Sequence, residues 1–187
     1  MYGANQSARK TIRNWMRKRD RMKILTVYYS YSCGNTKKIA EKLHKILGGD
    51  IERIETVKTY GGYEETVEIG QQEVQQGYCP PLRPLTYDVA DYDVIAIGSP
   101  TWWYTMAPAM RTFVTKQDFK DKKLILFSTH GGWPGQVIKH MKSFTHGKEI
   151  LGSLEIQFDS TGGNQQVTPE KDVETWLAQM KEKVDAL

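Results

Sequence analysis

Short apolar runs and helix-like repeats alternate along most of the chain. Residues 23–29 and 123–127 are apolar runs and residues 94–97 are a continuous one, the pattern typical of parallel strands that are buried on both faces. Residues 50–55 alternate charged with apolar side chains, which predicts a half-exposed strand, and residues 151–158 contain a last one. The sequence therefore predicts five strands.

Segments with apolar residues at helical spacing follow these strands. Helices are predicted over residues 37–47, 63–76, 106–115 and 136–144, and a last helix begins at Pro169 with Thr168 as its cap. We expect the inward face of that last helix to be Val173, Trp176, Leu177, Met180 and Val184.

The alternation of strands and helices predicts the fold class. It is typical of α/β domains with a parallel sheet, right-handed crossovers and helices on both faces. Five strands predict the doubly wound order 2-1-3-4-5, in which ligands bind at the carboxyl ends of the first and third strands. We assign residues 22–187 to this single domain.

The loop after the first strand, Ser30-Tyr-Ser-Cys-Gly-Asn-Thr36, is rich in hydroxyl groups and leads directly into a helix. Free N–H groups and the helix dipole favour an anion at such a turn, and a phosphate is the natural guest. The loop matches neither the GxGxxG dinucleotide pattern nor the GxxxxGK[ST] nucleotide loop. An ordinary capped turn is the alternative interpretation of this loop alone.

Two further loops should lie beside it in the predicted topology. Residues 98–104 carry Trp102, Trp103 and Tyr104, whose side chains offer stacking area for a flat ring. In the other loop, Gly131 and Gly132 have no side chain that would keep backbone N–H groups away from such a ring. A phosphate site next to an aromatic loop fits a flavin with a single phosphate. The three loops together therefore indicate flavin mononucleotide (FMN).

Charge is unevenly distributed along the chain. Residues 1–21 hold seven basic residues against Asp20 alone, a net charge of +6, so that the remainder of this +4 chain carries −2. This distribution argues against nucleic acid or a membrane as a partner of the main domain. The basic segment is expected to be a flexible extension or to lie upstream of a native start at Met22; an amphipathic helix is the third interpretation.

The numbers and positions of the cysteines and histidines bear on the chemistry of the site. Two cysteines, Cys33 and Cys79, make neither a disulfide framework nor a metal cluster, which fits a cytoplasmic location. His130 is interpreted either as a donor to the flavin or as a polar turn residue. The other histidines, expected at the surface, are His44, His140 and His146.

The chain resembles the flavodoxins, and among them the bacterial flavodoxins with a Trp-Trp loop. The residues that carry the resemblance are Tyr29-Ser30, Gly34-Asn35-Thr36-Lys37, Tyr92-Asp93-Val94-Ile95, Gly98-Ser-Pro-Thr-Trp-Trp103 and Thr129-His-Gly-Gly132. The likeness runs from about Met22 to the end of the chain. One departure is Cys33, which occupies the free position of the family's phosphate turn and leaves open which of the residues before it touch phosphate.

The resemblance implies FMN as cofactor and a set of binding residues in the three loops. Ser30, Ser32, Asn35 and Thr36 would contribute side chains to the phosphate, Gly34 its backbone, and the second and third loops would flank the isoalloxazine. The full set is Ser30, Ser32, Cys33, Gly34, Asn35, Thr36, Pro100, Thr101, Trp102, Trp103, Tyr104, Thr129, His130, Gly131 and Gly132. Of the two adjacent tryptophans, we expect one to stack on the ring and the other to pack or shield.

The favoured function is electron transfer between a reductase and an acceptor protein by a monomer or weak dimer, without catalytic residues. The first alternative is an FMN enzyme that reduces a quinone with NAD(P)H, because the long segment between residues 56 and 92 could wall a substrate pocket. The second is a flavin-free interaction module with the same fold.

Overall fold

The computed structural model describes residues 22–146 and 149–187. The expectation for residues 1–21 falls outside these described residues. The strands are β1 (Ile24–Tyr28), β2 (Asp50–Arg53), β3 (Val94–Trp102), β4 (Thr105–Met106), β5 (Lys123–His130) and β6 (Ile150–Gln157). The helices are α2 (Asn35–Leu47), α3 (Tyr63–Gln76), α4 (Pro108–Lys116), α5 (Val137–Phe144) and α6 (Glu170–Asp185), with a 3₁₀ turn over Val89–Asp91.

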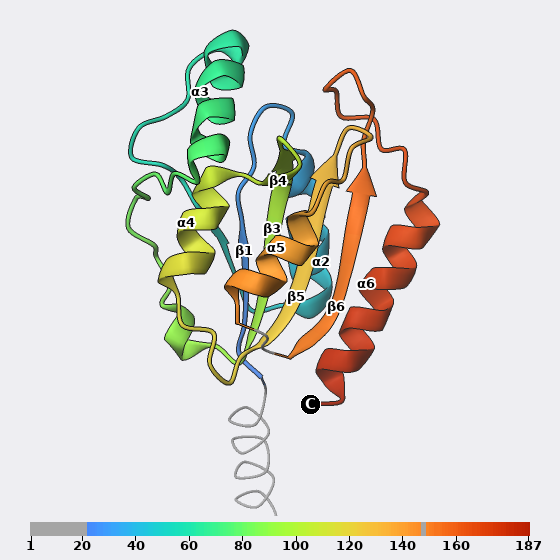
Figure 1. Cartoon of the computed structure of the whole chain (residues 1–187). Helices are drawn as coiled ribbons and strands as arrows, with labels where there is room; N and C mark the ends of the chain where they lie inside the picture. Colours follow the sequence, from blue (N-terminus) through green and yellow to red (C-terminus); the bar gives the residue numbers. More distant parts are fainter. Residues whose placement is uncertain (1–21, 147–148) are drawn as a thin grey trace, which may run out of the picture.

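The sheet has the predicted doubly wound topology. Its parallel strands run in the order β2-β1-β3-β5-β6, which is the predicted 2-1-3-4-5 order once the extra strand β4 is set aside. β4 was not predicted, and it pairs antiparallel with the end of β3. All parallel strands end at the same edge of the sheet, which is the upper edge in Figure 1.

Two hydrophobic cores cover the two faces of the sheet. Alternate residues of each central strand point to opposite faces, so that Leu25 and Val27 of β1 join one core while Ile24 and Tyr28 join the other. Helices α4 and α5 pack on the first face, and α2 and α6 pack on the second (Figure 1). Burial of apolar area, worth roughly 25 cal/mol per Å², stabilises the packing of the helices on both faces of the sheet.

Helix ends follow the expected chemistry with one exception. Gly48 and Gly77 take left-handed φ angles of 75° and 62° just after α2 and α3, as a glycine stop should. The inward face of α6 is the predicted one. The prediction that Thr168 caps α6 was wrong, because its hydroxyl accepts from the Gln157 N–H at 2.8 Å and Pro169 occupies the cap position.

Candidate functional site

The three predicted loops meet at the carboxyl edge of the sheet. Parallel pairing of β3 with β5 places Pro100 beside Thr129, and Tyr28 of β1 lies beside Gly98. The buried hydroxyls of Thr36 and Thr129 are 2.8 Å apart and join the first loop to the third. The strand order therefore brings together segments that lie about seventy to a hundred residues apart in sequence.

The first loop forms a tight turn at the start of α2. Gly34 is the residue before the helix, with φ at 73°, and its N–H donates to the Tyr31 carbonyl. Ser32 also has a positive φ, of 45°. The buried Ser30 hydroxyl accepts from the Lys37 N–H at 3.3 Å, while the amides of Asn35 and Thr36 begin the helix and have no intrahelical carbonyl to bond. Such a turn directs free N–H groups toward one point.

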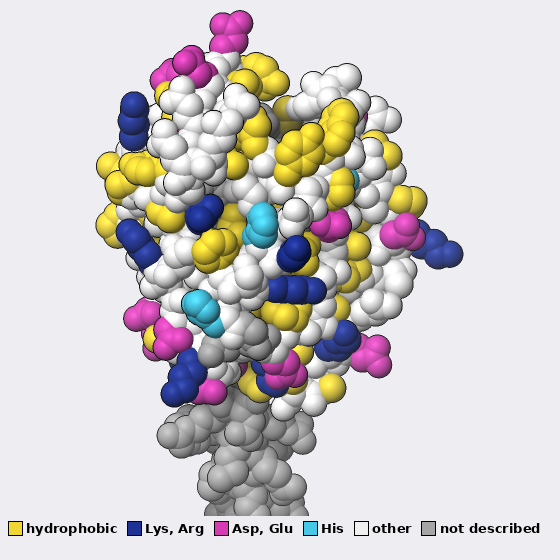
Figure 2. All heavy atoms as spheres, viewed as in Figure 1, with side chains coloured by type: hydrophobic (Ala, Val, Ile, Leu, Met, Phe, Trp, Pro, Cys, Tyr) yellow, Lys and Arg dark blue, Asp and Glu magenta, His cyan; other side chains and the backbone are white. Residues whose placement is uncertain are grey.

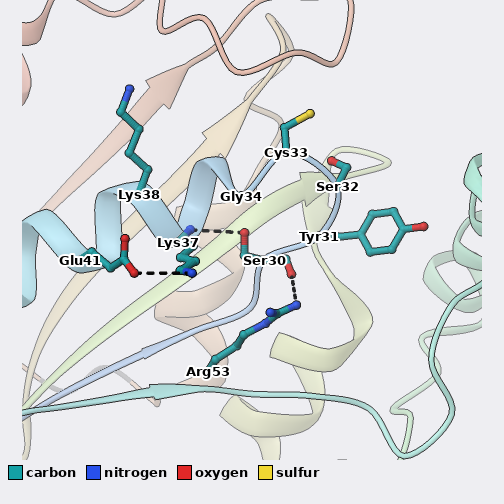
Figure 3. A pocket seen from close by; sticks show the side chains of 9 residues that line it. All are labelled: Ser30, Tyr31, Ser32, Cys33, Gly34, Lys37, Lys38, Glu41 and Arg53. Atoms are coloured by element: carbon teal, nitrogen blue, oxygen red, sulfur yellow. Dashed lines mark hydrogen bonds and ion pairs between the residues drawn. The ribbon is translucent and has the colours of Figure 1, made fainter.

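Basic side chains lie beside this turn: Lys37 and Arg53 are next to Ser30, and Lys38 points away from both of them (Figure 3). A cavity of about 560 Å³ is lined by Ser30, Tyr31, Ser32, Cys33, Gly34, Lys37, Lys38, Glu41 and Arg53. The guanidinium of Arg53 donates to the Ser30 carbonyl at 3.2 Å, and the Lys37 ammonium lies 3.7 Å from the exposed Glu41 carboxylate. Three cations against one carboxylate favour an anionic guest in this cavity.

Aromatic side chains line the other side of the same turn. A cavity of about 280 Å³ is bounded by Tyr31, Ser32, Tyr63, Thr66, Val67, Thr101, Trp102 and Trp103. It shares Tyr31 and Ser32 with the basic cavity, and Tyr31 points away from Lys37 and Arg53 (Figure 3). The site is thus one continuous region with a cationic end and an aromatic end.

Trp102 is the centre of the aromatic packing. Its ring makes edge-to-face contacts with Tyr29, Tyr31, Tyr60 and Trp103, with centroids 5.9, 5.7, 5.2 and 5.9 Å away. Each such pair is worth about 0.5–1.5 kcal/mol beyond the area it buries. Trp102 is partly buried, and it packs against the protein core as well as forming part of the cavity wall.

The second loop is a hairpin rather than an extended segment. Trp102 pairs with Thr105 across a two-residue turn, Trp103-Tyr104, whose φ angles are 43° and 65°. Two positive φ angles are the type I′ pattern, which normally requires Asn or Gly and is strained for bulky residues. The Gln136 N–H donates to the Tyr104 carbonyl at 2.8 Å and helps to hold the turn.

The third loop carries a neutral histidine. The Gly132 N–H donates to Nδ1 of His130 at 3.1 Å, so the proton of the neutral ring is on Nε2, which is free to donate to a ligand. Burial lowers the pKa of His130 below its usual value. His140, expected at the surface, is half-buried with a lowered pKa, and its Nδ1 lies 2.6 Å from the Thr105 hydroxyl. His44 is also half-buried, whereas His146 is exposed as expected.

Several predicted residues lie at the rim of the region. Tyr104 is 64% exposed and does not line the aromatic cavity, and Gly132 is exposed as well. The exposed Trp133 lies two residues before Gly135, which packs under the Tyr104 backbone. Figure 2 shows a recess between the lobe of α3 and the lobe formed by the loop after β6, with hydrophobic side chains beside it.

Two features of the region were missed from the sequence. Arg53 resembles an ordinary surface residue at the end of β2, and no local signal marks it. The loop between β6 and α6 reaches the first turn, where its Gly162 and Gly163 carbonyls accept from the Cys33 thiol and the Asn35 amide. Its Thr-Gly-Gly-Asn run was the available signal, because such residues often form tight turns at strand ends.

Among residues 22–146 and 149–187, no cluster of His, Cys, Asp and Glu side chains is suited to hold a metal ion. Within the same part of the chain, no helix has both the length and the apolar character needed to cross a bilayer.

Three solved structures are similar to this chain. A flavoprotein from Lactobacillus acidophilus NCFM, solved in complex with FMN, is 25% identical with a TM-score of 0.61, over 72% of this chain and 93% of that one. Proteins assigned as flavoproteins from Bacteroides eggerthii and Bacteroides uniformis are 24% and 22% identical, with TM-scores of 0.68 and 0.69. Both alignments cover 85% of this chain, and 98% and 99% of those chains, and they show a shared fold.

A comparison with curated proteins found no match. The sequence model of the flavodoxins, in contrast, matches residues 23–146, about two thirds of the chain and all three loops at the sheet edge. Sequence and fold agree on one conclusion: the chain belongs to the flavodoxin family.

Proposed function

We propose that this protein binds FMN and carries electrons between redox partner proteins. The observation that carries the proposal is the meeting of a cationic cavity and an aromatic cavity at Tyr31 and Ser32. FMN has one phosphate and one flat ring joined by a short polyhydroxyl chain, and it matches both ends. FMN, when bound, supplies the redox chemistry, and the protein supplies binding, orientation and electrostatics.

The first turn and its neighbours hold the phosphate in this proposal. Main-chain N–H groups at the start of α2 donate to it, the hydroxyl of the exposed Ser32 is free to join them, and Lys37, Lys38 and Arg53 supply positive charge. Asn35 supports the fit in another way: its Oδ1 is buried and has no donor among the described residues. A hydroxyl of the cofactor chain is a suitable donor for it.

The other two loops hold the ring. Trp102 is fixed by four aromatic neighbours, so we assign it the supporting role and Trp103 the role of stacking on the ring. His130 donates from Nε2 to a ring acceptor, and Gly131 and Gly132 leave room for main-chain contacts. The remaining predicted residues, Pro100, Thr101, Tyr104 and Thr129, shape the backbone around it.

The rim suits electron exchange with another protein. Tyr63, which lines the aromatic cavity, is 78% exposed, so one wall of this cavity is open to solvent. Tyr104 and Trp133 of the neighbouring loops are 64% and 63% exposed. Electron transfer needs only a close approach of two redox centres, and an open rim allows it. A reductase and an electron acceptor are the partner classes that this arrangement serves.

A second candidate is an FMN enzyme that transfers reducing equivalents from NAD(P)H to a quinone. It is favoured by one observation: Tyr63, Thr66 and Val67 of α3 form a wall of the aromatic cavity, as expected for a substrate pocket. The long segment between β2 and β3 thus contributes directly to the region where a flat substrate would bind.

One experiment separates these candidates. The purified protein should show the visible absorption of a flavin, and chromatography of the released cofactor should identify FMN. Addition of NADPH alone should leave the flavin oxidised if the protein is a carrier, and reduction should need a separate reductase. Rapid bleaching of the flavin by NADPH, with turnover on a quinone, would favour the enzyme. A colourless protein that leaves the fluorescence of added FMN unchanged would contradict both the carrier and the enzyme.

A further inference from the structure

The loop between β6 and α6 is organised by one carboxylate. Oδ1 of Asp159 accepts from the Thr161 N–H at 3.2 Å, from the Thr161 hydroxyl at 2.6 Å and from the Gly163 N–H at 3.0 Å. Oδ2 accepts from the Gln165 N–H at 3.1 Å. These bonds lower the pKa of Asp159, with the Thr161 hydroxyl as the largest cause, so the carboxylate is charged at neutral pH.

Two carbonyls of this loop reach the turn that begins α2. The Cys33 thiol donates to the Gly162 carbonyl at 3.2 Å, and Nδ2 of Asn35 donates to the Gly163 carbonyl at 2.9 Å. The residues of each pair are 129 and 128 positions apart, so nothing in the local sequence enforces their contact. The Asp159 bonds to Thr161 and Gly163 fix the backbone that carries both carbonyls.

We propose that Asp159 is a positioning residue for the cofactor phosphate: it holds the β6–α6 loop as a brace that fixes Cys33 and Asn35, and with them the N–H groups of the first turn. The proposal rests on the proposed function, since the phosphate is that of FMN. It also accounts for Cys33, whose thiol anchors the turn from outside.

The physical reason is preorganisation. The turn combines positive φ angles at Ser32 and Gly34 in an exposed loop, and a free loop of this kind must be ordered when a ligand binds. Fixing it beforehand removes that entropic penalty from binding. The carboxylate of Asp159 accepts four bonds from N–H and O–H donors, whereas the amide of an asparagine would bring a donor against one of them.

The test compares FMN with riboflavin, which has the same ring and no phosphate. Dissociation constants of the wild type, of Asp159→Asn and of the control Asp172→Asn are measured by quenching of flavin fluorescence. Asp172 lies in the first turn of α6, so the control removes a charge nearby without touching the brace. We expect Asp159→Asn to weaken FMN binding about tenfold and riboflavin binding by a clearly smaller factor, because riboflavin keeps the chain hydroxyls but lacks the phosphate, and the control to change neither.

A second readout needs no cofactor. Amide hydrogen exchange of the apo protein should become faster in residues 31–37 of Asp159→Asn, while the β1 amides stay protected as in the wild type. Thr161→Val removes one hydroxyl donor to the carboxylate, and it should shift FMN affinity and exchange in the same direction by a smaller amount. This milder variant keeps the test valid if Asp159→Asn does not fold.

The outcomes of these experiments distinguish the proposed role of Asp159 from the proposed binding of FMN. Unchanged FMN affinity in Asp159→Asn, an equal loss for FMN and riboflavin, or unchanged exchange in residues 31–37 would overturn the brace while FMN binding by the wild type stands. Failure of the wild type to bind FMN would overturn the proposed function and, with it, the role of Asp159 toward a phosphate. Selective loss of FMN affinity together with faster exchange would support both.

Discussion

Gly70 of α3 lies directly against the two tryptophans of the β3–β4 hairpin. A Cβ at this position would be 2.8 Å from Cζ3 of Trp103 and 3.1 Å from Cζ3 of Trp102. Ordinary carbon–carbon contacts are about 3.5–4.0 Å, so the rings would have to move by about 0.7 Å or the helix would have to shift. Gly70→Ala therefore perturbs the aromatic wall of the cavity without removing any side chain from it.

Two opposing effects determine how much Gly70→Ala changes the free energy of unfolding. In an open helix interior, replacing Gly by Ala stabilises a protein by about 0.8–1 kcal/mol. Overpacking against fixed side chains costs about 1–3 kcal/mol, and Trp102 is held by four ring contacts. We expect the steric cost to win, so that Gly70→Ala lowers the free energy of unfolding by about 0–2 kcal/mol instead of raising it.

Urea unfolding followed by far-UV circular dichroism measures this effect in a double-mutant cycle. In a Trp103→Ala background the 2.8 Å contact is gone and the 3.1 Å approach to Trp102 remains, so Gly70→Ala should become less destabilising or neutral, with a coupling energy of about 0.5–2 kcal/mol. Gly62→Ala is the control, because a Cβ there meets open space and its effect should be equal in both backgrounds. A stabilisation of about 1 kcal/mol by Gly70→Ala in the wild type would refute the packing of α3 on the hairpin.

Three other predictions concern the loops. Thr36→Val should cost about 1–3 kcal/mol in urea unfolding because the Thr129 hydroxyl stays buried without its partner, and adding Thr129→Val should recover part of the loss; equal single and double losses would contradict this. The lowered pKa values of His130 and His140 mean that the unfolded chain binds more protons just below the usual histidine pKa, so the free energy of unfolding should rise as the pH approaches that pKa of about 6.5 from below. His130→Asn should reduce this slope, and an unchanged slope in that variant would argue against a contribution from His130. Tyr104→Asn should raise the free energy of unfolding by about 0.5–1 kcal/mol, because asparagine tolerates a φ of 65° better than tyrosine, whereas Tyr104→Ala should not raise it. A lower free energy of unfolding in both variants would mean that the contacts of the tyrosine ring outweigh the backbone strain.

The spacing of apolar residues in the sequence was sufficient to predict the layers of the fold. The inward face of α6 follows from apolar spacing alone, because burial on one side of a helix leaves a direct trace in the sequence. The apolar runs that became β3 and β5 predicted buried parallel strands for the same reason, and Gly77 marked the end of α3. These features depend on local sequence and burial, which a single chain displays.

Features that depend on distant contacts were not predictable. The hairpin turn at Trp103 contradicts the local preference for Asn or Gly, and it exists because residues 134–136 and α3 hold it from both sides. Arg53 reaches the Ser30 carbonyl only because β2 is the parallel neighbour of β1. Thr168 looks like a helix cap, yet the strand β6 uses its hydroxyl instead. In each case tertiary structure overrides a local rule.

The most direct test of the account is a fluorescence titration of FMN with the apo protein. The account predicts quenching that saturates at one FMN per chain, together with a visible spectrum perturbed by the neighbouring aromatic rings. FMN whose fluorescence and spectrum remain those of the free cofactor at any protein concentration would contradict the assignment of the three loops as its site.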